Sequence, residues 1–399
     1  MLKKRILITM TYMHIGGAER SLLGLLDAID YSKFEVDLFL FCHEGSYMSM
    51  IPREVNLLPE IKEYEVLTTP LNRLKSINKR AYWKKKLAVS IARFMYALKG
   101  SRCSENGVTL WCEKMLVSGL PRINNKEYDL GISFMMYHSV LSKKACCRRT
   151  AGWCHTDYSV ANPLVSMDLS AWRSLDYIVH VSDDCLTEFL KVHPLLKNKA
   201  CVVENILSVK QIMEQATCHT CHDELIKKDL YILSLGRLTG QKNFLRAIES
   251  CAILKLRGYH LKWLVLGDGE NRKQLERAIL EYGVEDRFLL LGGIVNPYPY
   301  ISHCSIYVQT SDYEGKSVAI REAQIIGKPV LITNYETSRS QLKHGVDGII
   351  VDMTAKAVAE GIIELIEKPQ LRESLASACR QRDYSNANEI RKIYEFLNF

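Results

Sequence analysis

The strongest fold signal in the sequence is the stretch LYILSLGRLTGQKN, which occupies residues 230–243. Residues 230–235 are almost continuously apolar, as strands buried on both faces of a parallel sheet are. Gly236 permits a tight turn after this strand, and the polar residues that follow open a helix predicted over 243–255. A strand, a glycine-bearing loop and a helix in this order indicate a βα unit of a parallel α/β sheet.

The same alternation of apolar runs and amphipathic segments continues on both sides of this stretch. Downstream it predicts strands at 261–266, 288–291, 305–309 and 329–333, helices at 270–282 and 318–326, and helical chain beyond residue 352. Upstream it predicts strands at 5–9, 35–41, 128–133, 150–153 and 177–181, and a helix at 18–29. The polar stretch from Asn205 to about Lys228 is interpreted as a connection. The sequence therefore predicts an α/β protein with two Rossmann-like, doubly wound parallel sheets facing each other across a cleft.

The length of 399 residues exceeds what one hydrophobic core usually supports. We expect an N-terminal domain over residues 1–205, a C-terminal domain over 206–378, and a terminal helical segment at 379–399 that packs back toward the N-terminal domain. A hydrophobic fraction of 47% and a charged fraction of 25% exclude a disordered chain.

The cysteine content and the N-terminus indicate the compartment. Thirteen cysteines at irregular spacings, without a removable leader, are typical of reduced thiols in the cytoplasm. The segment KKRILITM at 3–10 superficially imitates a signal peptide, but its apolar run is short and no small-residue cleavage site follows. No apolar run approaches the ~20 residues that span a bilayer. We therefore expect a cytoplasmic protein, soluble or peripheral to a membrane.

Three loops of the C-terminal half place polar residues after strands, where open α/β sheets bind their ligands. In the first, Arg237 and Lys242 flank the N-terminus of the predicted helix, whose free N–H groups and dipole attract anions. Together with Gly236 these residues form a candidate diphosphate cradle that needs no metal. The alternative is an ordinary strand–loop–helix with solvated basic residues. The second loop, Gly267-Asp268-Gly269, is more typical of a turn than of a site.

The third loop, SDYEGKS at 311–317, leads into a helix that carries a second acid. An eight-residue separation places Glu314 in the loop and Glu322 about two turns into the helix. The two carboxylates can then accept hydrogen bonds from different hydroxyls of one extended ligand. The N–H groups of Gly315, Lys316 and Ser317 can contact phosphate. The alternative is a helix-capping acid and an unrelated surface acid.

These loops together resemble the donor-binding domain of the retaining GT-B glycosyltransferases of group 1, also known as family 4. The resemblance is carried by Gly236-Arg237-Leu238 with Lys242-Asn243, by Gly267-Asp268-Gly269, and by Glu314 and Glu322, which match the family's pair of glutamates with seven residues between them. It also includes Asn296–Tyr300, Gly327–Val330, and the Gly16-Gly17-Ala18-Glu19 loop near the N-terminus, and so covers most of the chain.

The resemblance implies roles for single residues. Arg237 and Lys242 would neutralise the leaving diphosphate, Glu322 would hold the ribose hydroxyls, and Glu314 would contact the donor sugar near the reacting carbon. Gly16 and Gly17 would face the diphosphate.

The resemblance also implies a role for His155, in Trp153-Cys154-His155-Thr156-Asp157. It resembles the family histidine on the acceptor side and would contact the sugar, or stabilise the oxocarbenium ion through its neighbouring carbonyl. The alternative is that His155 is an ordinary packed polar residue without a role in the reaction.

At the level of the reaction, the resemblance implies a retaining, hexosyltransferase-type enzyme. It would move a sugar from a nucleotide-diphosphate-sugar, with UDP favoured, to a glycan or lipid-linked acceptor in the synthesis of a cell-surface polysaccharide such as capsule or O-antigen. Neither a cofactor nor a metal is expected. The Lys316-Ser317 step departs from the aromatic-containing step common in the family, which leaves the sugar open. Two alternatives share the architecture: a sugar-nucleotide isomerase or epimerase, and a non-catalytic membrane-associated sugar-nucleotide sensor.

The segment 71–102 contains ten Lys or Arg residues and no acid. Leu87, Ile91, Phe94, Met95 and Leu98 recur at helical spacing within it, and Tyr82 and Trp83 precede them. A basic amphipathic helix with aromatic flanks is typical of proteins that lie on an anionic membrane, here the inner face of the cytoplasmic membrane. The alternative is a core-facing helix with a solvated basic face. A nucleic-acid partner is not expected, since no binding module is recognisable.

The segment Cys218-His219-Thr220-Cys221-His222 matches the attachment signature of a c-type haem, and its thiols and imidazoles are possible zinc ligands. No second ligand pair follows at zinc spacing, and haem attachment takes place outside the cytosol. We interpret this segment as a polar linker.

Overall fold

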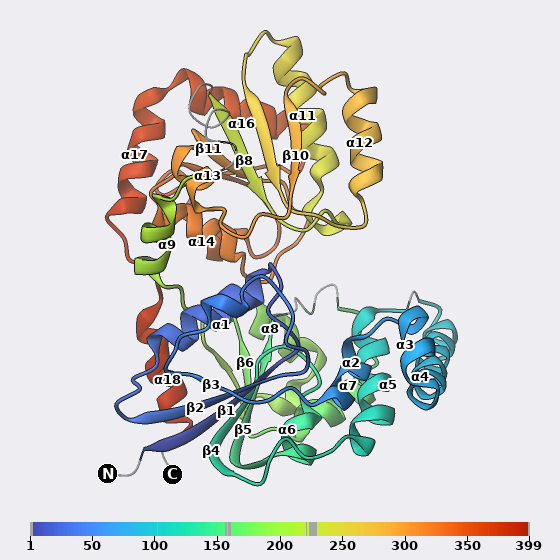
Figure 1. Ribbon diagram of the computed structural model, residues 1–399. Helices are drawn as coiled ribbons and strands as arrows, with labels where there is room; N and C mark the ends of the chain where they lie inside the picture. The colour runs from blue at the N-terminus through green and yellow to red at the C-terminus, as the bar shows by residue number, and fades with distance from the viewer. Residues whose placement is uncertain are drawn as a thin grey trace. The chain divides into compact units, whose positions relative to one another are not determined.

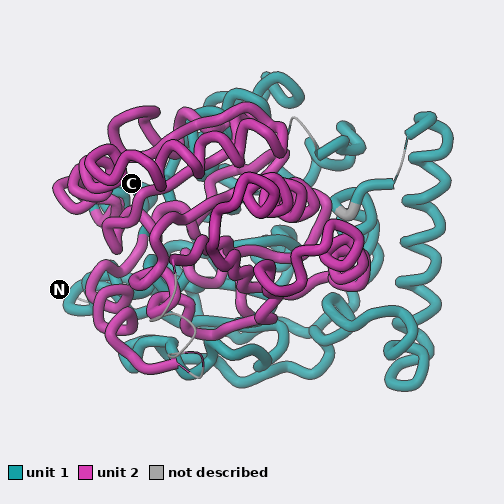
Figure 2. Tube along the Cα trace, turned by 90° about the horizontal axis from the view of Figure 1, so that it is seen from above, with its two compact units in different colours: residues 1–14, 22–206, 388–399 teal, residues 15–21, 207–387 magenta. Residues whose placement is uncertain are grey.

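The computed structural model describes residues 3–101, 103–155, 158, 161–220, 222 and 230–397. The chain forms two compact units, coloured separately in Figure 2. The first unit comprises residues 1–14, 22–206 and 388–399, and the second comprises residues 15–21 and 207–387. Cys221 of the haem-like signature, Arg102 of the basic segment, and Thr156 and Asp157 lie outside the described residues.

The first unit contains a seven-stranded parallel sheet in the order β3-β2-β1-β4-β5-β6-β7 (Figure 1). Its strands are β1 (Lys4–Met10), β2 (Phe34–Leu40), β3 (Asn56–Leu57), β4 (Glu127–Ser133), β5 (Cys146–Cys154), β6 (Tyr177–His180) and β7 (Ala200–Val202). Its helices are α1 (Gly17–Ala28), whose first residues are counted with the second unit, α2 (Glu65–Thr68), α3 (Leu71–Ile77), α4 (Lys79–Leu98), α5 (Glu105–Leu116), α6 (Ser139–Lys144), α7 (Val165–Arg173), α8 (Asp183–Val192) and α18 (Ile390–Glu395).

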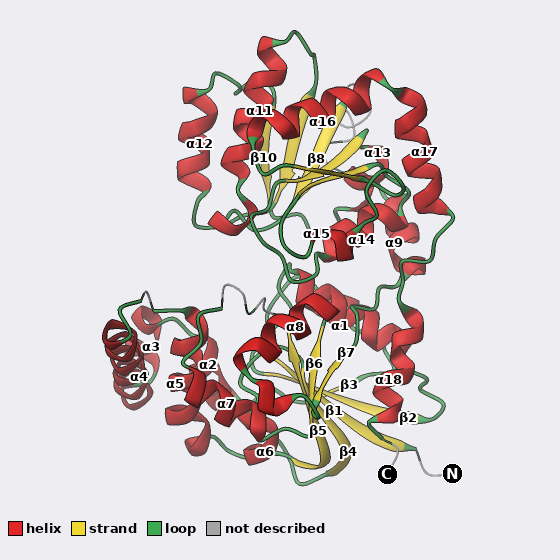
Figure 3. Ribbon diagram, turned by 180° about the vertical axis from the view of Figure 1, so that it is seen from behind, coloured by secondary structure: helices red, strands yellow, loops and turns green. Residues whose placement is uncertain are grey.

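The second unit contains a six-stranded parallel sheet in the order β10-β9-β8-β11-β12-β13. Its strands are β8 (Tyr231–Leu235), β9 (Lys262–Leu266), β10 (Phe288–Gly292), β11 (Ile306–Gln309), β12 (Val330–Thr333) and β13 (Ile349–Val351). Its helices are α9 (Val209–Ala216), α11 (Phe244–Leu256), α12 (Arg272–Glu281), α13 (Tyr298–His303), α14 (Val318–Ile325), α15 (Ser338–Gln341), α16 (Ala355–Glu367) and α17 (Pro369–Arg380). Figure 3 shows helices on both faces of this sheet.

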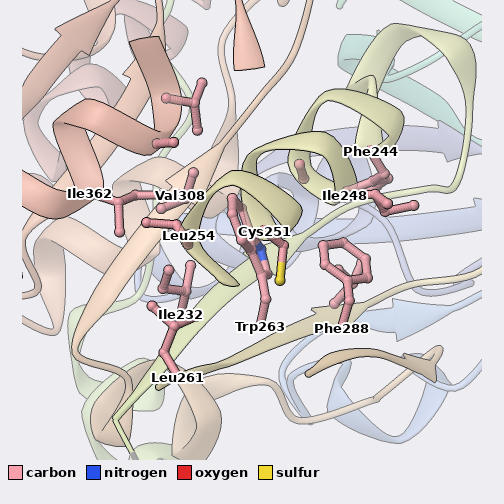
Figure 4. Close-up of a cluster of buried hydrophobic side chains, with 14 of the residues drawn as sticks. Ile232, Phe244, Ile248, Cys251, Leu254, Leu261, Trp263, Phe288, Val308 and Ile362 are labelled. Atoms are coloured by element: carbon pink, nitrogen blue, oxygen red, sulfur yellow. The ribbon is translucent and has the colours of Figure 1, made fainter. Parts of the chain in front are cut away.

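The apolar run of β8 explains how the second sheet is covered. Successive strand residues point to opposite faces, so Ile232 packs with Phe244, Trp263 and Ile362 under α11 and α16 (Figure 4). Tyr231, Leu233 and Leu235 join the opposite cluster, which includes residues of α9, α13 and α14. Burial on both faces is why the strand reads as continuously apolar.

Both sheets have the strand order 3-2-1-4-5-6 of doubly wound folds, counted from the first strand of each, and the first sheet adds a seventh strand. The predicted fold class of two Rossmann-like, doubly wound parallel sheets is confirmed. The polar stretch interpreted as a connection contains the helix α9, which Ser208 caps through its hydroxyl. None of the described helices has both the length and the apolar character to cross a bilayer.

Candidate active site

The order of the second sheet reverses between β8 and β11, which therefore form its topological switch point. In doubly wound sheets, ligands bind outside the carboxyl ends of the strands at this point. β8 ends at Leu235 and β11 ends at Gln309. The loops that follow these two ends carry the predicted diphosphate cradle and the first of the two predicted glutamates.

The loop after β8 is fixed by backbone contacts with the loop after β9. The N–H of Leu238 donates to the carbonyl of Asp268, and the N–H of Asn271 donates to the carbonyl of Leu238, both at 3.0 Å. Gly267 has a φ of +149°, and a Cβ atom there would collide with the carbonyl oxygen of Gly236. The Gly267-Asp268-Gly269 segment therefore acts as a support, in agreement with its interpretation as a turn.

An ion pair joins the two loops at the switch point. The Lys242 Nζ atom lies 2.6 Å from the Glu314 Oε1 atom, and both side chains are largely buried, at 16% and 7% exposure. Gln309 Nε2 and Ser311 Oγ also donate to Glu314 Oε1, at 3.0 and 2.6 Å. Because buried charges are tolerated when they are paired and hydrogen-bonded, this carboxylate is fully supported. The fold thus brings together two predicted site residues that are 72 positions apart in the chain.

A second set of contacts holds the same two loops in register. Asn243 adopts a left-handed conformation with a φ of 44°, and its side chain caps α11 by accepting from the N–H of Arg246. The Arg246 guanidinium donates to the Asp312 carboxylate at 2.7 Å and to the carbonyl of Thr310 at 2.7 Å. These contacts fix the positions of the two loops that carry Lys242 and Glu314.

Arg237 lies in the same loop as Lys242 and is exposed. Within the described part of the chain it has no carboxylate partner at ion-pair distance. Its positive charge helps to lower the pKa of Glu19, although burial, the larger effect, leaves that pKa above its usual value. The guanidinium is thus within electrostatic reach of residues 15–21, which belong to the second unit.

Glu322, the second predicted carboxylate, is completely buried on α14. Tyr298 Oη donates to its Oε1 atom at 2.9 Å, and the Arg20 guanidinium forms an ion pair with its Oε2 atom. Burial raises the pKa of Glu322, and the charge of Arg20 opposes that shift. Burial raises the pKa of Tyr307 well above its usual value, and the nearby charges of Glu322 and Glu314 raise it further.

Arg20 and Tyr298 were not predicted as site residues. Both lie in or directly beside segments that carry the family resemblance, since Arg20 follows the Gly16–Glu19 loop and Tyr298 lies within Asn296–Tyr300. Their pairing with Glu322 depends on the fold, because Arg20 is 302 positions away from it in the chain.

The remaining predicted phosphate contacts lie at the start of α14 and in the Gly16 loop. The N–H of Ser317 donates to Gln341 Oε1 at 3.1 Å, and Lys316 Nζ donates to the carbonyl of Ser340 at 3.1 Å. Gly16 lies against the Glu19 carboxylate, and a Cβ atom on Gly17 would touch Val318 at 3.6 Å. The Ser317 N–H and the Lys316 ammonium therefore already donate hydrogen bonds to residues 340 and 341. Gly315, the third predicted phosphate contact, is half-buried.

His155 belongs to the first unit and follows the carboxyl end of β5. Its Nε2 atom lies 2.9 Å from the carbonyl oxygen of Phe134, so the neutral ring donates from Nε2 and leaves Nδ1 as an acceptor. Burial lowers the pKa of His155 to about 4, which keeps the ring uncharged at neutral pH.

The part of the chain that the structure describes contains no group of three or more His, Cys, Asp and Glu side chains able to hold a metal ion.

Part of the second unit matches a known protein family. Residues 222–382 match the model of the family "Glycosyl transferases group 1". The resemblance to the group 1 glycosyltransferases found in the sequence is therefore confirmed for this part of the chain.

The chain is similar to several curated bacterial glycosyltransferases. It is 27% identical over 210 residues, 52% of this chain and 55% of the other, to N-acetylgalactosamine-N,N'-diacetylbacillosaminyl-diphospho-undecaprenol 4-alpha-N-acetylgalactosaminyltransferase of Campylobacter jejuni. It is 28% identical over 179 residues, 44% of this chain and 50% of the other, to the amylovoran biosynthesis glycosyltransferase AmsD of Erwinia amylovora. The chain thus spans about half the length of the curated relatives it matches.

Solved structures match the whole chain in fold. Alr3699/HepE of Anabaena, solved in complex with UDP and glucose, has a TM-score of 0.68 at 16% identity and covers 98% of both chains. TarM of S. aureus has a TM-score of 0.70 at 12% identity and covers 99% of this chain and 100% of its own.

Proposed function

We propose that the protein is a retaining glycosyltransferase that takes a hexose from a nucleotide-diphosphate-sugar, with UDP-sugars favoured. The observation that carries this proposal is the Lys242–Glu314 ion pair at the switch point of the second sheet, within the residues that match the group 1 glycosyltransferase model. The HepE and TarM structures, which contain UDP or UDP-glucose, support the choice of nucleotide.

The geometry supports an exchange of partners when the donor binds. A diphosphate at the start of α11 would meet Arg237 and the Lys242 ammonium, and a phosphate oxygen would replace Glu314 as the partner of Lys242. Glu314 would then accept hydrogen bonds from the sugar hydroxyls, while Glu322, held by Tyr298, would accept from the ribose. Fixed positive groups placed where charge develops on the leaving phosphate stabilise the transition state electrostatically.

The acceptor is proposed to be a glycan or a lipid-linked glycan of a cell-surface polysaccharide. Two relatives are named for the biosynthesis of amylovoran and of a capsular polysaccharide, and the Campylobacter relative is named for a diphospho-undecaprenol-linked substrate. His155, neutral and hydrogen-bonded through Nε2, is proposed to contact the transferred sugar. The enzyme would work in the cytoplasm, peripheral to the membrane, and without a metal.

Donor binding is tested by thermal shift with UDP and a panel of sugar nucleotides. A donor at about a hundred times its Kd is expected to add ~2.7 kcal/mol to the free energy of unfolding. Arg237→Gln should weaken binding about tenfold, since one charge-assisted contact is lost. The control Arg277→Gln, an exposed arginine on α12 of the same unit, should bind as the wild type does. Equal effects of the two substitutions would contradict the diphosphate cradle.

Transfer is tested with Glu314→Gln and Glu322→Gln, each expected to lose turnover by roughly a hundredfold, the usual cost of removing one preorganised polar group. Turnover of the donor without an acceptor would instead identify an isomerase. Donor binding that survives Glu314→Gln, with no transfer by the wild type, would identify a sensor.

A further inference from the structure

The helix α4 turns its small residues toward the protein and its large apolar residues outward. Its buried positions are Ala81, Lys85, Ala88, Ala92 and Tyr96. At 3.6 residues per turn, Trp83, Leu87, Phe94 and Leu98 fall within a stripe about 60° wide on the opposite face. Trp83 is 62% exposed and Leu98 is 69% exposed. The alanines therefore make the core contacts of α4, and the large apolar side chains of the stripe do not.

α4 is the outermost helix of the first unit. In Figures 1 and 3, α2 and α5 lie between it and the sheet, and α3 lies beside it. The large apolar side chains of the stripe therefore have no covering element among the described residues of this unit.

A hollow of about 260 Å³ opens between α3 and α4, beside the apolar stripe. Three cations line it, Lys75 from α3 and Lys86 and Arg93 from α4, together with polar atoms of Tyr82 and Ser90. All three cations are exposed, and the segment 71–102 contains no acid. None of the three has a carboxylate partner within the described ranges. Lys86 Nζ also lies 4.8 Å from the centre of the Trp83 ring, which links the hollow to the stripe.

We propose that the α3–α4 hollow binds the phosphate head group of an anionic lipid, while Trp83, Leu87, Phe94 and Leu98 insert into the outer part of the bilayer. Two observations select a bilayer as the partner. The hollow carries only positive charge, which complements a phosphodiester, and large apolar side chains stand directly beside it, as a helix that lies in a membrane interface requires. This inference rests on the proposed function in one respect, because a transferase with a lipid-linked acceptor works at a membrane.

Flotation of the full chain with vesicles tests the proposal. We expect the protein to float with phosphatidylcholine vesicles that contain phosphatidylglycerol and to stay behind with phosphatidylcholine alone. Lys86→Gln with Arg93→Gln should lower partitioning about thirtyfold, because each basic residue near an anionic surface contributes on the order of 1 kcal/mol. Phe94→Ser with Leu98→Ser should lower it about as much.

Matched variants distinguish a specific head-group site from a general attraction between the positive charge of α4 and an anionic membrane. Lys79→Gln with Arg80→Gln removes two exposed cations of α4 that do not line the hollow, and should lower partitioning clearly less than the Lys86 and Arg93 pair. Equal losses in the two pairs would overturn the head-group site. Leu195→Ser, at a residue 73% exposed elsewhere in the first unit, should leave partitioning unchanged.

Further outcomes overturn the docking surface as a whole. Absence of binding to phosphatidylglycerol vesicles would do so, and binding to a single-stranded RNA without binding to vesicles would assign the surface to nucleic acid. Thermal shift with UDP is run on every variant and should be unaffected. A protein that binds vesicles but no sugar nucleotide would refute the proposed function alone, and the converse would refute the docking surface alone.

Discussion

Lys85 differs from the other cations of the basic segment, because its ammonium is buried and binds the protein itself. It donates to the carbonyls of Val66, Leu67 and Thr69 at 2.9–3.1 Å, where α2 ends. Helix ends leave carbonyl groups unsatisfied, and a lysine there can satisfy them. The desolvation that accompanies this burial lowers the pKa of Lys85.

Lys85→Met should therefore lower the free energy of unfolding by about 2 kcal/mol, since hydrogen bonds from a charged donor are lost and carbonyls stay buried. Urea denaturation at pH 7 measures the change. Lys86→Met, at the exposed neighbouring position, should change stability by less than about 0.5 kcal/mol. Similar losses in both variants would show that Lys85 has no structural role.

The sequence indicated candidate site residues one by one, but not their contacts. Glu314, Glu322, Arg237 and Lys242 were proposed because each lies in a recognisable segment that follows a strand or begins a helix. The contact between Lys242 and Glu314 depends on β11 lying beside β8, which local patterning does not reveal. The contact of Arg20 with Glu322 is of the same kind, because it joins residues of distant segments.

Among the elements, the loops after β8 and β9 support each other at Gly267. Gly267→Ala would place a Cβ atom against the backbone of Gly236 at a φ that side chains rarely adopt. We expect a loss of about 2 kcal/mol or more in the free energy of unfolding, together with weaker donor binding, because the cradle rests on this contact.

Chemical denaturation and UDP thermal shift measure the two effects. Gly240→Ala is the control, since a Cβ atom there meets nothing within 4 Å. If Gly267→Ala unfolds like the wild type, the loop after β9 does not support the cradle.

Among the strands, the predicted and the missed elements differ mainly in length. The strands of four or more residues were predicted within a few positions, because each buries a full apolar run. β3, β7 and β13 have two or three residues and were missed, since so short a run shows no periodicity. α9 was taken for a connection because its sequence between Ser208 and Thr217 contains Lys, Gln and Glu on one face.

For the whole molecule, buried neutral histidines make stability depend on pH. His180 is fully buried against Phe189, and neither of its ring nitrogens has a hydrogen-bond partner among the described residues. Burial lowers the pKa of His180 to about 3, and that of His138 to about 4. The folded state resists protonation of these rings, whereas the unfolded chain takes up protons below pH ~6.5.

The contribution of His180 to stability is therefore fully present above pH ~6.5 and is lost progressively as the pH falls toward about 3. Between pH 7.5 and 5 the wild type should lose about 2 kcal/mol relative to His180→Leu, which cannot titrate. Urea denaturation at both pH values gives the difference. His260→Leu, at an exposed histidine, should keep the wild-type pH profile. A pH-independent difference between wild type and His180→Leu would contradict this account.

The last helix of the chain completes the first unit. Tyr394 stacks on Phe34 at 4.5 Å and Phe396 stacks on Tyr177 at 4.2 Å between ring centres, and Lys4 Nζ donates to the carbonyl of Leu397 at 2.6 Å. During translation, the first unit can therefore complete its packing only after residues 390–397 have left the ribosome. The strands of the second sheet lie within residues 231–351, so this sheet can form before residues 390–397 have been synthesised.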